Sequence, residues 1–102
     1  MGEGPQYDFE WDLGKARANR QRHGVSFEEA ARIFLDRLAV SLFDEEHSGA
    51  EDRWITLGRL PSGPLLVVIH TIDELGQGRY RVRLISARTA TARERRQYEE
   101  QP

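Results

Sequence analysis

Cysteine is absent from the 102-residue chain, and no apolar run approaches the roughly 20 residues that a membrane-spanning helix needs. Without cysteine there is no disulfide framework, no thiol nucleophile and no thiolate metal site. The opening stretch MGEGPQYDFEWD lacks the basic start and apolar core of a signal peptide. These absences argue against a disulfide-stapled secreted protein and a helical membrane protein. We expect a cytoplasmic protein that folds as a single domain over residues 1–102.

Lysine is nearly absent as well, because Lys15 is the only lysine and the other fourteen basic residues are arginines. The net charge of −2 conceals an uneven distribution: residues 1–52 carry twelve acidic and six basic side chains, and residues 53–102 carry nine arginines and five acidic side chains. The planar fork of arginine fits phosphate or carboxylate in bidentate fashion. Arginine-rich codons of a high-GC genome also explain the number of arginines, but they do not explain their spacing.

Two helices are predicted in the first third of the chain, over residues 13–23 and from residue 27 to about residue 36. The first is basic and has few apolar side chains, whereas apolar residues recur at helical spacing along the second. Both have clear start signals. The capping residues are Asp12 and Gly24 for the first helix and the capping box of Ser26 and Glu29 for the second.

Strand-like segments follow the second helix. Residues 65–72, LLVVIHTI, are the most hydrophobic stretch and therefore the expected central strand. The turn LPSG at residues 60–63 and a glycine-bearing loop at residues 73–78 give hairpin-length connections. The other expected strands cover residues 38–43, 53–59 and 79–87, and residues 7–11 alternate aromatic and acidic side chains as a short edge strand would.

The last helix has its own start signal, and the order of elements indicates a fold class. Thr91 and Glu94 form a capping box for a helix over residues 92–100. Residues 1–6 carry no pattern and are expected to be a frayed tail. The order predicts an α+β fold with an antiparallel β-sheet of about four strands, to which the short N-terminal strand can add. Two N-terminal helices and one C-terminal helix would lie on one side of this sheet.

Arginines alternate with apolar residues in RYRVRLISARTA, residues 79–90. Period-two alternation places Arg79, Arg81 and Arg83 on one face of a strand, and Arg88 follows five residues after Arg83. Like charges on one face repel each other, so this face is either a solvated surface paired with the acidic first half or a binding surface for a polyanion. Residue types alone favour the solvated surface. The other arginines that can join such a surface are Arg53, Arg59 and Arg95.

Two other side chains could transfer protons or stack on a base. His70 interrupts the most apolar strand, where it is either a hydrogen-bonded core residue or a proton-transfer group. Tyr98 lies among arginines on the last helix, where it either covers the sheet with its ring or contacts a base. His47 stands in an acidic loop without the ligand spacing of a metal site, so no metal is expected. No glycine-rich phosphate loop or other cofactor motif is present.

Three stretches taken together resemble the BrnT family of type II toxins. In chain order they are FEWDLGKARANRQRHGVSFEEAARIF at residues 9–34, EDRWITLGR at residues 51–59, and VRLISARTATARERRQYE at residues 82–99. The family pattern has a counterpart at each of these places and in the same order. One small departure is Leu84, where the family often has isoleucine. A shared block of this length is much more specific than any single motif.

The resemblance implies a RelE-like fold and a metal-independent endoribonuclease that cleaves RNA and inhibits translation without a cofactor. It also implies a cognate BrnA-like antitoxin that neutralises the toxin and represses the operon with it, so that operator DNA is contacted only through the antitoxin. The alternative is a non-catalytic basic module that docks an acidic protein or a nucleic acid.

Metal-independent RNA cleavage uses the ribose 2′-hydroxyl as nucleophile, so the enzyme must stabilise charge on phosphorane oxygens and move two protons. Arginine suits the first task and not the second, because it does not deprotonate. We therefore expect Arg83 and Arg88 to stabilise the transition state. Proton transfer then falls to His70, Tyr98 or a carboxylate such as Glu51, or it remains largely uncatalysed. The surrounding phosphate contacts are expected to come from Arg53, Arg59, Arg79, Arg81, Arg95 and Lys15.

Overall fold

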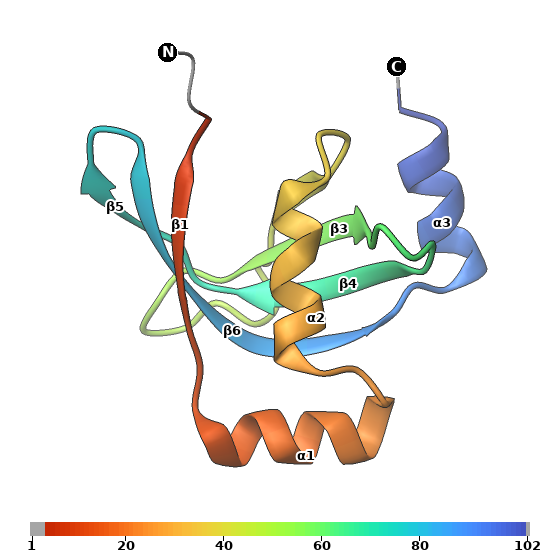
Figure 1. The fold of residues 1–102 in the computed structure, drawn as a ribbon, viewed down its shortest axis with the longest axis horizontal. Helices are drawn as coiled ribbons and strands as arrows, with labels where there is room; N and C mark the ends of the chain where they lie inside the picture. The colour runs from red at the N-terminus through yellow and green to blue at the C-terminus, as the bar shows by residue number, and fades with distance from the viewer. Residues whose placement is uncertain (1–3, 102) are drawn as a thin grey trace.

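A mixed sheet of six strands forms the centre of the molecule in a computed structural model that describes residues 4–101 (Figure 1). The elements are β1 (Gln6–Glu10), α1 (Leu13–His23), α2 (Phe27–Ala31), the 3₁₀ helix η1 (Arg32–Leu35), β2 (Val40–Phe43), β3 (Trp54–Arg59), β4 (Leu65–His70), β5 (Asp73–Gly76), β6 (Arg79–Thr89) and α3 (Ala92–Glu99). The strand order is β1-β6-β4-β3-β2, and β5 pairs with β6. No helix of the described residues is long and apolar enough to cross a membrane.

The predicted α+β class is confirmed, but the sheet differs from the prediction in two ways. β1 runs parallel to β6, so the sheet is mixed and not purely antiparallel. The expected loop over residues 73–78 contains β5, which folds back on β6 as a hairpin. Gln77 and Gly78 make this possible because both have positive φ, 52° and 78°, as a tight hairpin turn of the primed type requires. The sheet therefore has six strands where about four were expected.

The helices also differ from the prediction. The segment expected to be one helix up to about residue 36 changes from α2 to the 3₁₀ helix η1 after Ala31. The helices were expected on one side of the sheet, but α2 and α3 lie against opposite faces, since they pack with different strand residues. The expected tail falls partly on residues 1–3, outside the described residues, whereas Gln6 already opens β1 and donates its N–H to the Gly78 carbonyl at 2.9 Å.

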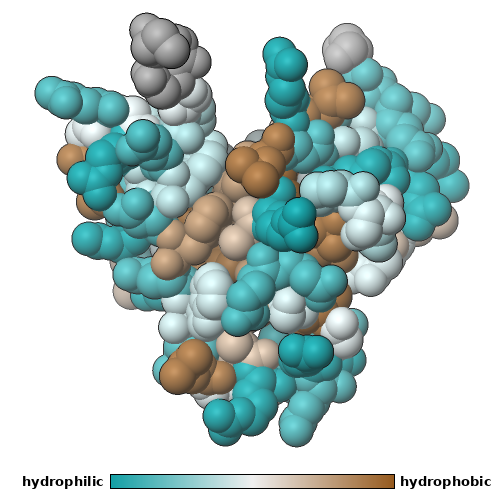
Figure 2. All heavy atoms as spheres, in the orientation of Figure 1, coloured by the Kyte–Doolittle hydropathy of each residue, from teal (hydrophilic) through white to brown (hydrophobic). Residues whose placement is uncertain are grey.

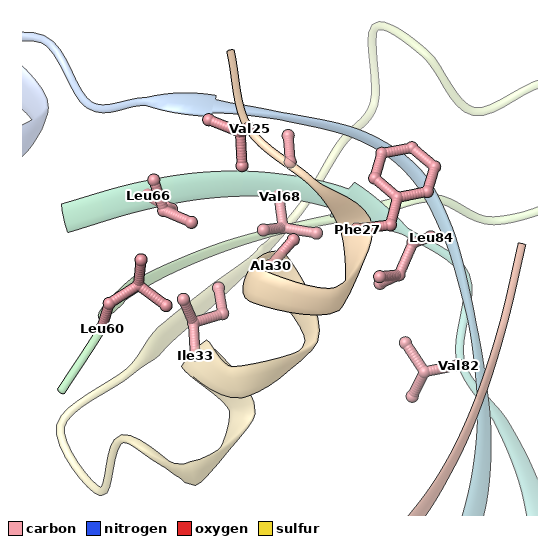
Figure 3. Packing of buried hydrophobic residues seen from close by; sticks show 10 residues of the cluster. Val25, Phe27, Ala30, Ile33, Leu60, Leu66, Val68, Val82 and Leu84 are labelled. Atoms are coloured by element: carbon pink, nitrogen blue, oxygen red, sulfur yellow. The ribbon is translucent and has the colours of Figure 1, made fainter. Parts of the chain in front are cut away.

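Two apolar clusters lie on the two faces of the sheet. On one face, Phe27, Ala30 and Ile33 of the α2 and η1 segment meet side chains of β4 and β6 (Figure 3). The strand residues are Leu66, Val68, Val82, Leu84 and Ala87. On the other face, Leu65 and Val67 of β4 meet Tyr98 of α3, together with Leu57 and Ala90. The α2 side is seen in Figure 2, where hydrophobic side chains reach the surface beside α2 and hydrophilic ones cover much of the rest.

A β-bulge interrupts the pairing of β6 with β4. Ile69 pairs with Ser86 and His70 pairs with Leu84, so Ile85 has no partner on β4. The extra residue reverses the alternation of β6, because Leu84 before it and Ala87 after it both join the core on the α2 side. Residues after the bulge consequently face the opposite way from what strict alternation predicts.

Candidate functional site

Four arginines of β6 share the face of the sheet that is opposite α2. Arg79, Arg81 and Arg83 alternate with residues whose side chains turn to the α2 side, among them the buried Val82. Strict alternation from Arg83 would send Arg88 to the α2 side, but the bulge at Ile85 returns it to the face of the other three. We call these four residues the arginine face: Arg79, Arg81, Arg83 and Arg88.

Each arginine of this face contacts a carboxylate. Arg79 pairs with Asp8 at 2.7 Å, and Arg81 approaches Glu10 at 3.8 Å. Both acids come from β1, whose parallel register places Asp8 beside Arg81 and Glu10 beside Arg83. Arg83 bonds to Glu51, and Arg88 bonds to Glu94. The first three carboxylates belong to the acidic half of the chain, as the solvated-surface interpretation expects. Such exposed pairs contribute little stability each, so an anionic ligand can replace them at a small cost.

Glu94 holds Arg88 in a bidentate pair, with Nη1 to Oε1 at 2.8 Å and Nη2 to Oε2 at 2.7 Å. Glu94 also accepts the Thr91 N–H at 2.8 Å as part of the predicted capping box of α3, which is confirmed. The hydrogen bond from Arg88 lowers the pKa of Glu94 to about 2, and the same bond raises the pKa of Arg88. The start of α3 therefore fixes the guanidinium of Arg88 in one orientation. The sequence indicated Glu94 only as a cap.

We expect Glu94→Gln to lower stability in a pH-dependent way, because glutamine keeps the cap but removes the charge pair with Arg88. The pKa of Glu94 is about 2 in the folded chain, below its ordinary value of 4.5, so the pair stabilises the fold above pH 4.5. This contribution is lost as the pH falls towards 2. Urea unfolding from pH 7 to pH 2 measures the free energy of unfolding of both proteins. The difference between wild type and Glu94→Gln should shrink as the pH falls, and Glu100→Gln, at an exposed position, serves as control. A difference of constant size would contradict the assignment.

Glu51 stands between two arginines at the edge of the arginine face. It bonds to Arg83, and Arg53 approaches the same Oε1 at 3.7 Å. Arg53 also has a buried Nε without a hydrogen-bond partner. The structure thus brings Arg53, Arg83 and Glu51 together, three residues that the sequence suggested separately. Glu51 therefore lies next to two guanidinium groups, each of which has further N–H donors that can contact a phosphate.

Tyr98 and Arg59 form a separate group at the other end of β3. The Tyr98 hydroxyl donates to Asp36 at 2.5 Å, and the Arg59 guanidinium lies 5.3 Å from the centre of the Tyr98 ring. Burial and the Asp36 carboxylate raise the pKa of Tyr98. Burial alone would raise the pKa of Asp36, but hydrogen bonds from Tyr98 and from the backbone N–H groups of Arg59 and Leu38 lower it. The ring covers the second apolar cluster, so Tyr98 packs and positions this end of the sheet.

His70 lies on the α2 side of the sheet, away from the arginine face. Its side chain is 2 % exposed and its Nε2 is 2.7 Å from the Thr56 hydroxyl, which in turn is 2.7 Å from the Ser41 hydroxyl. Nδ1 is 3.0 Å from the Thr71 carbonyl, so Nδ1 donates and Nε2 accepts. Burial lowers the pKa of His70. Of the two roles that the sequence allowed for His70, this arrangement matches the hydrogen-bonded core residue and not the proton-transfer group.

The two remaining predicted phosphate contacts lie at the margins. Lys15 lines a small groove of about 190 Å³ between α1 and β6, together with His23 and Ser86. Arg95 is exposed on α3 and forms no ion pair among residues 4–101. Lys15 is therefore close to the bulge next to the arginine face.

The mixed sheet, the helices on its two faces and the arginine face define a small α+β domain with an arginine-rich sheet face. Residues 11–94 match the family model described as "Ribonuclease toxin, BrnT, of type II toxin-antitoxin system". The chain therefore belongs to this family of ribonuclease toxins, as its sequence motifs predicted, and the family implies an RNA target and an antitoxin partner.

A solved structure supports the fold. The crystal structure of the Brucella abortus ribonuclease toxin BrnT matches with a TM-score of 0.56 and 22% sequence identity, covering 84% of this chain and 97% of that one. Among individually curated proteins, none matches this chain in sequence. The wider likeness to RelE stays a prediction.

Proposed function

We propose that the arginine face binds the RNA backbone and that Arg83 and Arg88 stabilise the phosphorane formed during cleavage. One observation carries this proposal: the bulge at Ile85 turns Arg88 onto the face of Arg83, where strict alternation would have buried it in the α2 layer. The bulge returns Ala87 to the core and keeps the charge of Arg88 out of it, so that Arg83 and Arg88 end on the same face. Two guanidinium groups on one face can contact two oxygens of the same phosphate or of neighbouring phosphates.

The chemistry follows the metal-independent route. The 2′-hydroxyl oxygen attacks the adjacent phosphorus while its proton passes to Glu51, which Arg53 and Arg83 hold. The bond from phosphorus to the 5′ oxygen breaks, and that oxygen leaves with a proton from water. The products are a 2′,3′-cyclic phosphate and a 5′-hydroxyl. Arg83 and Arg88 offset the developing negative charge without giving up a proton.

The carboxylate partners do not prevent RNA binding. A guanidinium has five N–H donors, so an arginine can keep one carboxylate bond and still donate to a phosphate. Arg79 and Arg81, at the far end of the face from Arg88, attract and align the chain electrostatically. Arg53, Lys15 and Arg95 extend the cationic surface at its margins, whereas Arg59 is engaged with Tyr98.

In the cell, we infer that RNA cleavage in the cytoplasm inhibits translation. A BrnA-like antitoxin encoded nearby neutralises the toxin, and the complex represses the operon through DNA contacts made by the antitoxin. The second candidate is a non-catalytic basic module that docks an acidic protein or a nucleic acid. The exposed ion pairs of the arginine face favour it, because an anionic partner can exchange with their carboxylates without any chemical step.

The test uses a short RNA with one 2′-deoxyribose at the linkage that the protein cleaves. We expect cleavage of the all-ribose RNA in excess EDTA, with a cyclic phosphate on the product, and no cleavage at the deoxy position. Mass spectrometry of the products identifies the ends. Activity that disappears with EDTA, or cleavage at the deoxy linkage, would contradict the mechanism. RNA that stays intact in all conditions would favour the binding module.

A further inference from the structure

An open groove of about 890 Å³ lies between η1, the end of β3 and α3, apart from the arginine face. Its apolar lining includes Leu35, which is 75 % exposed, and Leu38, which is 62 % exposed. Leu60 and Pro61 complete this apolar strip. Figure 2 shows hydrophobic side chains among hydrophilic ones in this region, between the upper end of the α2 segment and α3. Single exposed leucines are ordinary, but here two of them line one groove together with Leu60 and Pro61.

Cations rim the same groove. Arg32 and Arg37 line it, and neither forms an ion pair within residues 4–101. Arg59 lines it as well, with Glu99 at 3.6 Å. Asp36 is the acidic residue of the lining, and its carboxylate is occupied by Tyr98 and two backbone N–H groups. The groove therefore offers apolar contacts in its centre and unpaired positive charge at its rim, in contrast to the arginine face.

We propose that this groove anchors the antitoxin through an acidic amphipathic helix, an inference that rests on the proposed function for the existence of that partner. Apolar side chains one helical turn apart would cover Leu35 and Leu38, and acidic side chains beside them would pair with Arg32 and Arg37. A helix satisfies both features of the groove at once, because its apolar and charged faces lie side by side.

Two other occupants fit less well. RNA would satisfy Arg32 and Arg37 but leave the two leucines without apolar contacts. A second copy of the chain would bring arginines against arginines across a two-fold axis, and like charges at an interface oppose association. Because the groove contains neither Arg83 nor Arg88, binding of the antitoxin and RNA cleavage can be separated by mutation.

The experiment titrates the purified chain with the antitoxin from the same operon by isothermal calorimetry and measures RNA cleavage in parallel. Leu35→Glu with Leu38→Glu, and separately Arg37→Glu, are the groove variants. The matched controls are Leu13→Glu and Arg17→Glu on α1, where both side chains are exposed. We expect the double leucine variant to lose at least about 30-fold in affinity, as a central hot spot does, and to cleave RNA normally. Arg37→Glu should weaken binding less and flatten its salt dependence.

The outcomes separate this proposal from the proposed function. Affinity within about twofold of wild type for the double variant would overturn the docking proposal. If the groove variants lose RNA cleavage but keep their affinity for the antitoxin, the groove binds RNA. If the wild-type chain is a dimer that the groove variants dissociate, again with unchanged antitoxin affinity, the groove binds a second copy. Either result overturns the proposal. An inactive wild-type chain that still binds the antitoxin through the groove would refute only the proposed function.

Discussion

Arg88→Ala is expected to lower RNA cleavage by about 100- to 1,000-fold, the usual cost of removing one preorganised group that stabilises transition-state charge. Glu94 fixes the guanidinium of Arg88 before substrate arrives, so no ordering is needed at the moment of reaction. In cells, the same change should relieve growth arrest when the chain is expressed without its antitoxin. Single-turnover cleavage of a defined RNA measures the effect directly.

The fold of this variant should survive. Thr91 and Glu94 keep both hydrogen bonds of their capping box without Arg88. The pair of Arg88 with Glu94 is partly exposed, so its loss costs about 1 kcal/mol or less. Arg88→Lys keeps the charge but loses the bidentate fork, and we expect an activity between those of alanine and wild type. Circular dichroism and urea unfolding verify that a low activity is not a folding defect.

Arg96→Ala is the matched control. Arg96 is two residues from the buried Tyr98, which turns it about 200° around α3 and into solvent. Arg96→Ala removes one positive charge, as Arg88→Ala does, but from an exposed position on α3. Cleavage should therefore change by less than about threefold. Equal losses for Arg88→Ala and Arg96→Ala would mean that only the overall charge matters. Full activity of both Arg88→Ala and Arg83→Ala would remove the arginine face from the mechanism.

Local signals in the sequence were sufficient for the helix starts and for the end of α1, but not for the end of α2. The capping boxes at Ser26 and at Thr91 and the left-handed Gly24 after α1 are all confirmed, because each depends on residues within one turn. β5 could not be predicted in this way: its side chains are exposed, so it has no apolar pattern, and it exists through pairing with β6. The parallel direction of β1 depends on its long-range pairing with β6, which no local sequence pattern predicts.

In the candidate site, too, local patterns predict some features and long-range strand pairing sets the others. The shared face of Arg79, Arg81 and Arg83 follows from alternation, whereas the position of Arg88 depends on a bulge that nothing in ISART indicates. His70 faces the α2 layer because it alternates with Leu66 and Val68 along β4. Both faces of β4 are apolar, so the sequence does not show which of them carries α2. The acids of β1 were visible as an alternating pattern, but their contact with arginines requires the parallel pairing.

Asn19 connects α1 to the strand that carries the arginine face. Its Nδ2 donates to the carbonyls of Ala87 at 2.9 Å and Val25 at 3.1 Å, and its Oδ1 accepts the Ala87 N–H at 3.0 Å. β1 pairs with β6 only as far as Arg83, so the amide of Asn19 replaces the missing strand partner at Ala87. These contacts identify Asn19 as a packing residue beside the bulge.

We expect Asn19→Ala to cost about 3 kcal/mol or more, because it leaves two carbonyls and one N–H without partners and each such buried group costs about 1–3 kcal/mol. That is a large share of the roughly 5–15 kcal/mol that holds a domain together. Asn19→Asp should not rescue the loss, since a carboxylate accepts from Ala87 but faces two carbonyl oxygens that it repels. Arg20→Ala, an exposed change on the same helix, should stay within about 0.5 kcal/mol.

Urea unfolding gives these energies, and hydrogen exchange of the Ala87 amide locates their origin. In Asn19→Ala the exchange at Ala87 should accelerate more than at the paired residues of β4, because only the edge of β6 loses its partner. If Ala87 keeps its protection, another group replaces the Asn19 amide and the stability loss must arise elsewhere. If protection is lost, Arg88, the next residue, loses the fixed backbone that the bulge gives it. Cleavage measured at a temperature where the variant is still folded should then fall, which ties the position of the proposed catalytic arginine to a single amide on α1.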